Sequence, residues 1–246
     1  MYYKRQSYTL TDSDKVLIKS LAKLLFHGKD TKIELPFIVL DSSCKSPKQF
    51  KSPQAIENTS FDTELLGYYS PNIFTISLLE EPISDVARLL NVDKDILRSI
   101  VLIHEIGHYI TQCPEYVLHP RWEEMIKSRE RFWKDSEFML EGVRRDNHVA
   151  SAAIMTKSSR KLLETLAQLL TYFVVREVPE YEEVFNRMTA HQTRDYTEFR
   201  AYQNNDPCYL FRTMSLVRGI DYRNQTMDPT EQIYADDYHL KWLLKG

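Results

Sequence analysis

The residues best suited to chemistry are two histidines and a glutamate in the pattern His-Glu-x-x-His, at residues 104–108. Residues four apart share one face of an α-helix, so the imidazoles of His104 and His108 can reach the same zinc ion. Glu105 would flank a water activated by that ion and serve as its general base. The spacing therefore predicts metal-assisted hydrolysis, and the alternative is a pair of core histidines hydrogen-bonded to the backbone.

The sequence around the motif predicts a buried helix over residues 94–112. Asp93 is a suitable N-cap, apolar residues occupy most sides of the segment, and Pro114 ends it. Buried imidazoles need partners for their ring nitrogens, and a metal ion is one such partner.

A third ligand is expected from a second apolar helix, predicted over residues 162–175. Glu164 places a carboxylate near the start of this helix. Burying a carboxylate is costly unless it is paired or bound to a cation, and catalytic zinc usually has three protein ligands. Glu164 is therefore the first candidate, and Gln168, one turn later, is placed to orient a ligand. In the alternative, Glu164 faces solvent and favours the helix dipole.

Other ligand candidates rank lower. The metzincin pattern would need a third histidine at position 114, where the chain has proline. His148 ranks second and His119 third on ligand chemistry alone. Cys113 follows the motif helix, but a small buried residue is the preferred interpretation.

Composition restricts the class of protein. The chain has 246 residues, 43% of them hydrophobic, which favours one domain over residues 1–246. A net charge of −3 gives no reason to expect a nucleic-acid or membrane partner. The sequence has no secretory h-region and no uncharged apolar run of membrane-spanning length, so a cytoplasmic protein is expected. The three cysteines are too scattered for a disulfide framework.

Local patterns predict the remaining elements. Together they are a first helix that starts at a capping box in residues 11–14 and closes at Gly28, a strand at 37–40, a loop at 41–60, a hairpin at 67–78, and helices at 83–90 and 121–146. The hairpin is either a plain core element or the sheet edge with which an extended substrate pairs. The charges of the 121–146 helix are interpreted as a solvated face, and this helix is a candidate lid over the cleft.

With His104, His108 and Glu164 in these positions, the chain resembles the gluzincins, zinc metallopeptidases that combine His-Glu-x-x-His with a glutamate on a later helix. More narrowly, Glu164-x-x-Ala167-Gln168 is similar to a segment of the compact ImmA/IrrE-type proteins. The resemblance covers about residues 66–177, with a helical part expected over 178–246. It implies a zincin-like α+β fold, mainly helical, with a small mixed or antiparallel sheet beside the motif helix.

The resemblance also implies a mechanism. Zinc held by His104, His108 and Glu164 would activate a water for attack on a peptide bond, and Glu105 would transfer the proton to the leaving amine. Gluzincins often add a tyrosine or histidine that stabilises the oxyanion, for which the candidates are His191, Tyr196 and Tyr202. A peptide or protein is the expected substrate. The alternatives are a non-proteolytic zinc-binding regulatory or assembly module and a zinc hydrolase of a small amide or ester.

Overall fold

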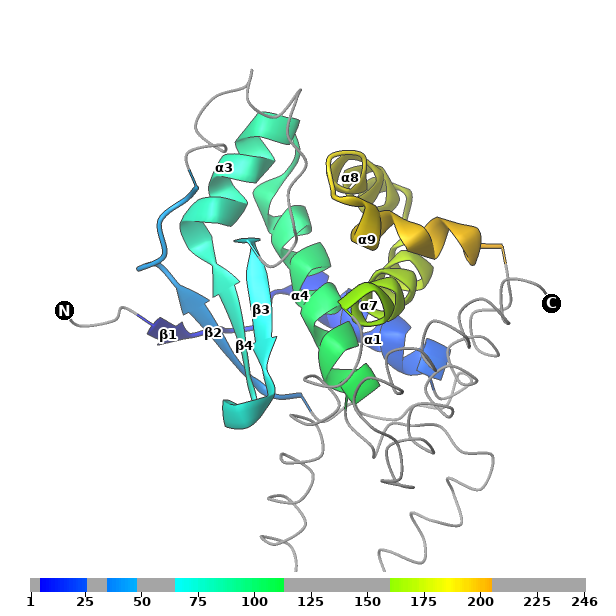
Figure 1. Cartoon of the computed structure of the whole chain (residues 1–246). Helices are drawn as coiled ribbons and strands as arrows, with labels where there is room; N and C mark the ends of the chain where they lie inside the picture. The colour runs from blue at the N-terminus through cyan, green and yellow to red at the C-terminus, as the bar shows by residue number, and fades with distance from the viewer. Residues whose placement is uncertain (1–4, 26–34, 48–64, 113–159, 205–246) are drawn as a thin grey trace, which may run out of the picture.

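A computed structural model describes residues 5–25, 35–47, 65–112 and 160–204. In this part of the chain a four-stranded sheet lies on one side of a long central helix, and further helices cover the other side (Figure 1). The α+β architecture with a small mixed sheet agrees with the sequence-based prediction. The predicted helix at 121–146, its role as a lid, and Pro114 lie outside the described residues.

The sheet has the strand order β1-β2-β4-β3. Strands β2 and β4 are parallel, whereas β1 pairs with β2 and β3 pairs with β4 in antiparallel fashion. The outer strands β1 and β3 therefore form the two edges of the sheet. The strands are β1 (Arg5–Ser7), β2 (Phe37–Asp41), β3 (Gly67–Ser70) and β4 (Thr75–Leu79).

The predicted hairpin is confirmed, with a longer turn than expected. Pro71–Ile73 forms a short 3₁₀ helix, and Phe74 adopts a left-handed conformation with φ of 52°. The second strand therefore starts at Thr75 instead of Ile73. All of β4 is buried because it lies between β2 and β3, so β3 is the outer strand of the hairpin among the described strands.

The first helix, α1 (Asp12–Leu25), begins at the predicted capping box. The Thr11 hydroxyl accepts a hydrogen bond from the Asp14 backbone N–H at 3.2 Å, and the Asp14 carboxylate accepts one from the Thr11 N–H at 2.8 Å. This reciprocal pair satisfies two backbone donors that a helix start would leave without partners. Gly28, the predicted end of the helix, lies outside the described residues.

Helix α3 (Glu80–Leu90) leads directly into the motif helix, α4 (Lys94–Gln112). The turn between them uses Asn91 in a left-handed conformation with φ of 51°. Asp93 is the N-cap, as predicted: its carboxylate accepts hydrogen bonds from the N–H groups of residues 95 and 96 at 2.8 and 2.9 Å.

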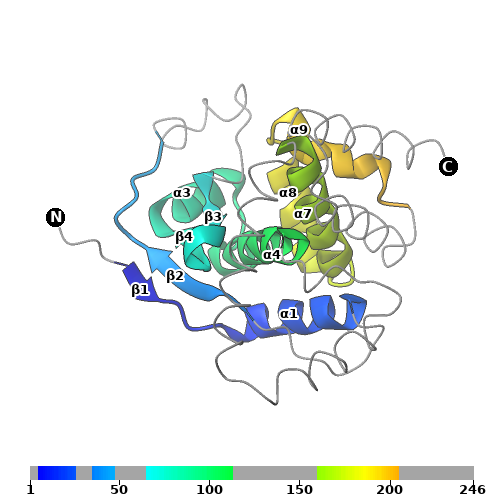
Figure 2. The same cartoon turned by 60° about the horizontal axis from the view of Figure 1, so that its bottom comes forward.

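Helix α4 is the central element of the described structure. Every residue from 101 to 110 is buried. In Figure 2, α4 lies between the sheet with α3 on one side and α7 (Arg160–Val175) with α8 (Pro179–Thr189) on the other, and α1 runs along it. The predicted second buried helix is thus confirmed as α7. No helix in the described ranges is long and apolar enough to cross a membrane.

Candidate metal centre

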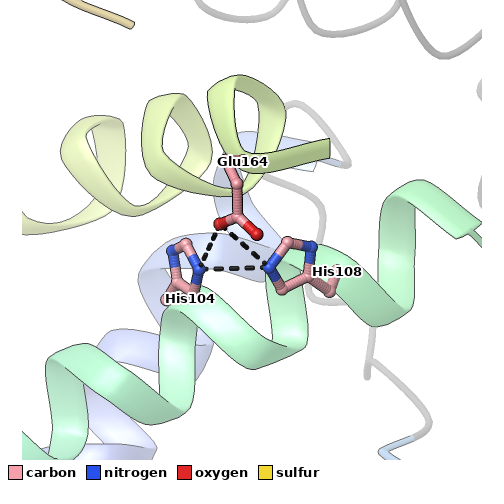
Figure 3. A group of neighbouring side chains, drawn as sticks. All are labelled: His104, His108 and Glu164. Carbon is pink, nitrogen blue, oxygen red and sulfur yellow. Dashed lines mark hydrogen bonds and ion pairs between the residues drawn. The ribbon is translucent and has the colours of Figure 1, made fainter. Parts of the chain in front are cut away.

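The two motif histidines point from α4 toward α7 and meet there (Figure 3). Their Nε2 atoms lie 3.1 Å apart, and both rings are buried. The four-residue spacing stacks the two side chains on the same helical face, because one helical turn takes 3.6 residues. The two Nε2 atoms are therefore directed at the same position, where both could bind one ion.

Glu164 completes this group from the facing helix. Its Oε2 atom lies 3.2 Å from Nε2 of His104 and 3.4 Å from Nε2 of His108. The glutamate is only 2% exposed, so the alternative in which it faces solvent is wrong. Within the described ranges, these three residues are the group whose ligand atoms, all within 4.8 Å of one another, could hold a metal ion.

The separations fit a tetrahedral zinc site. Ligand atoms bound about 2.0–2.1 Å from zinc in tetrahedral geometry lie about 3.3–3.4 Å apart. The three observed separations, between 3.1 and 3.4 Å, are close to that value. Two imidazole nitrogens and one carboxylate oxygen are also a donor set that zinc prefers, and they leave a fourth position for water. The residues present therefore fit a zinc ion.

The protonation states suit metal binding too. Burial is the largest influence on the pKa of His104 and lowers it, which favours the neutral imidazole. Burial raises the pKa of Glu164, but the two histidines beside its carboxylate, His108 foremost, outweigh this effect and hold the pKa well below its usual range. A neutral imidazole and an ionised carboxylate are the forms that ligate zinc.

Two small residues bring the helices close enough for this contact. A Cβ atom built on Gly107 of α4 would lie 3.0 Å from the Cα atom of Ala167 on α7. The glycine inside the first motif and the alanine inside the second therefore face each other where the two helices pack. This packing explains why a carboxylate on α7 can reach the histidines of α4.

Glu105 is buried next to the ligand face, on the side toward the sheet. A Cβ atom on Gly67 of β3 would lie 3.5 Å from Cγ of Glu105 and 2.9 Å from Cγ1 of Val101. Glu105 thus lies between the histidine cluster and the edge strand of the sheet. The sequence predicted a hairpin here, but nothing in it indicated that Gly67 allows this close approach.

The three candidate oxyanion donors differ in their position relative to the histidine cluster. Tyr196, in the short helix α9 (Arg194–Thr197), is buried with its ring centroid 6.0 Å from that of His104. Tyr202 follows the 3₁₀ segment η5 (Glu198–Ala201), and burial together with the charge of Glu198 raises its pKa to about 12. His191 lies half-buried in the turn after α8, where its N–H donates to the carbonyl of Met188. Of the three, Tyr196 is the one whose ring contacts a candidate ligand.

Gln168 is buried on α7, the helix that carries Glu164, and its predicted role of orienting a ligand stays a prediction. Its side chain acts to raise the pKa of His104, against the larger effect of burial. Its Nε2 atom donates a 2.6 Å hydrogen bond to Oε1 of Gln192, a residue that the sequence gave no reason to single out. The lower-ranked ligand candidates His119, His148 and Cys113 lie outside the described residues.

Comparison with known proteins assigns no family. No protein-family model, no curated protein and no solved structure matches this chain.

Proposed function

We propose that this protein is a zinc-dependent metallopeptidase of the gluzincin type, with a zincin-like fold. The observation that carries the proposal is the convergence of three buried ligand atoms from α4 and α7 at separations of 3.1–3.4 Å. His104, His108 and Glu164 would hold the ion. A buried carboxylate among apolar residues is costly without a cation, and this site provides the place for one.

When bound, zinc supplies a Lewis acid that lowers the pKa of water and polarises the carbonyl of an amide. Glu105 is the general base: it takes the proton from the attacking water and returns it to the leaving nitrogen. Its burial between the histidines and the sheet keeps bulk water away from the carboxylate and so strengthens its interactions. A purely structural zinc site would have no use for a general base at this position.

A peptide substrate is supported by the position of the sheet edge. Strand β3 is an outer strand, and Gly67 brings its backbone next to Glu105. An extended peptide that pairs with an outer strand can present its backbone amides in sequence, which is how strand addition achieves binding. Tyr196, against His104, is the preferred donor to the oxyanion.

The proposal is tested by peptide cleavage with the zinc-loaded protein. Peptides from a mixed library would be followed by mass spectrometry for wild type, Glu105→Gln and the control Glu180→Gln, an exposed glutamate of α8. Because general-base catalysis contributes about 10²–10⁴-fold, Glu105→Gln should lower turnover by that factor and leave the zinc content unchanged. Full activity of Glu105→Gln, or no cleavage by zinc-loaded wild type, would contradict the proposal.

A further inference from the structure

Strand β3 lies along the motif helix α4, which presents three residues to it at one-turn spacing (Figure 1). Val101, Glu105 and Tyr109 are four residues apart and so share one face of the helix. Gly67 lies against the first two of them. Two residues later in β3, the ring centroid of Tyr69 lies 5.7 Å from that of Tyr109. Because alternate residues of a strand face the same side, β3 rests on α4 through these two positions, beside the proposed general base.

A side chain at position 67 is excluded by lack of space and not by the backbone conformation. The φ angle of Gly67 lies outside the left-handed region, so the conformation of the strand does not require glycine. A Cβ atom there would lie 2.9 Å from Cγ1 of Val101 and 3.1 Å from the backbone oxygen of Ser77. Non-bonded carbon atoms pack at about 3.5–4.0 Å, so the new methyl group and Val101 would have to separate by roughly 0.6–1.1 Å.

Neither neighbour of the new methyl group can move easily. Val101 is fully buried within α4, and a β-branched side chain in a helix has one strongly preferred rotamer. The oxygen of Ser77 belongs to the backbone of β4, to which β3 is held by an antiparallel ladder. The remaining adjustment is a movement of the strand away from α4.

We infer that Gly67 is a positioning residue that sets the distance between β3 and the residues of the metal centre on α4. The inference rests on the proposed function, in which an extended peptide pairs with β3. Such a peptide would move with the strand, whereas Glu105 and the two histidines move with the helix. A wider spacing would therefore displace the scissile carbonyl from Glu105 and from the ion without removing any catalytic group. A misplacement of about 1 Å can lower turnover by about 100-fold.

The kinetic test uses Gly67→Ala, Val101→Ala and the double variant, all loaded with zinc. The control is Ser70→Ala, at the other end of β3, where the side chain makes no capping hydrogen bond. The substrate is the library peptide that wild type cleaves fastest. Gly67→Ala should lower kcat by up to about 100-fold, with KM and zinc content close to those of wild type and of the control.

The double variant separates a positioning role from a general loss of stability. Val101→Ala removes the methyl group that the new Cβ would meet, so the double variant should recover most of the lost kcat. Two substitutions that were merely destabilising would instead add their effects. If Gly67→Ala alone fails to fold, the added Val101→Ala should restore folding. Wild-type kcat in Gly67→Ala, or a double variant no better than Gly67→Ala, would overturn the inference.

Crystal structures of zinc-free wild type, Gly67→Ala and the double variant give a measurement that does not depend on activity. The distance between the Cα atoms of residues 67 and 105 should increase in Gly67→Ala and return toward the wild-type value in the double variant. An unchanged distance in Gly67→Ala would overturn the inference. If the distance changes as expected but wild type cleaves no peptide, the spacing role of Gly67 stands and the proposed function fails instead.

Discussion

At the scale of single residues, some members of the site could be predicted from their spacing in the sequence, and others are known only from the fold. The positions of His104 and His108 follow from their four-residue separation, because the helix fixes both directions. Glu164 was inferred by a different argument, the cost of a carboxylate in an apolar helix, and its 2% exposure agrees with that argument. Gln192 could not be predicted, because a polar residue in a turn gives no sign of its partner.

The metal-free protein should lose stability as the pH falls below about 6.5, the ordinary pKa of histidine. Burial lowers the pKa of His104, so the unfolded chain takes up a proton there at a higher pH than the folded chain. One extra proton bound by the unfolded state lowers the free energy of unfolding by about 1.4 kcal/mol per pH unit.

Urea unfolding of wild type and His104→Gln, in the presence of a chelator at pH 5.5 to 7.5, measures this contribution. The variant should show a shallower loss of stability with falling pH than wild type. If the free energy of unfolding depended equally on pH in the two proteins, the pKa of His104 would not be lower in the folded than in the unfolded chain.

At the scale of elements, the close approach of α4 and α7 creates the site. Each helix was predictable from its apolar pattern, whereas their relative placement depends on which small residues face each other. Gly107 and Ala167 do so, and a Cβ on Gly107 would lie 3.0 Å from the Ala167 Cα atom. The sheet has the same limit: the hairpin was predicted from its sequence, but that β3 is its outer strand in the described sheet follows only from the pairing of β2 with β4.

Replacing Gly107 with alanine should destabilise the protein and weaken zinc binding together. In an ordinary helix position this change stabilises by about 0.5–1 kcal/mol through helix propensity. Here the new methyl group meets backbone, so overpacking should instead cost about 1–3 kcal/mol and move Glu164 away from the histidines. Chemical denaturation and zinc titration measure the two effects. A stabilised variant with wild-type zinc affinity would show that the helices are not in close contact at this position.

At the scale of the whole molecule, α1 is tied to the motif helix by a buried polar network. Asp14 is fully buried, and its carboxylate accepts hydrogen bonds from Ser99 Oγ on α4 at 2.6 Å and from the Tyr8 hydroxyl at 2.7 Å. Arg98 donates to the same hydroxyl at 2.9 Å. The capping box was predictable because it is local, but the Asp14–Ser99 contact spans 85 residues and appears only in the fold.

Substituting Asp14 by alanine should therefore destabilise the protein far beyond the loss of a helix cap. A cap alone contributes about 1 kcal/mol, and the buried donors left without an acceptor should bring the total to about 3 kcal/mol. Asp12→Ala, at an exposed aspartate of the same helix turn, is the matched control and should leave the midpoint of unfolding unchanged. Equal unfolding midpoints for the two variants would mean that the buried network around Asp14 does not stabilise the protein.

The most direct test of the central claim is the zinc content per chain of protein purified without added metal. Wild type and Glu180→Ala, which changes an exposed glutamate, would be compared with Glu164→Ala by elemental analysis. We expect about one zinc per chain in the first two proteins and a large loss in Glu164→Ala, because a catalytic site needs three protein ligands. Equal zinc in all three proteins would contradict the role of Glu164 as a ligand. No zinc in any of them, even after incubation with the metal, would contradict the metal centre itself.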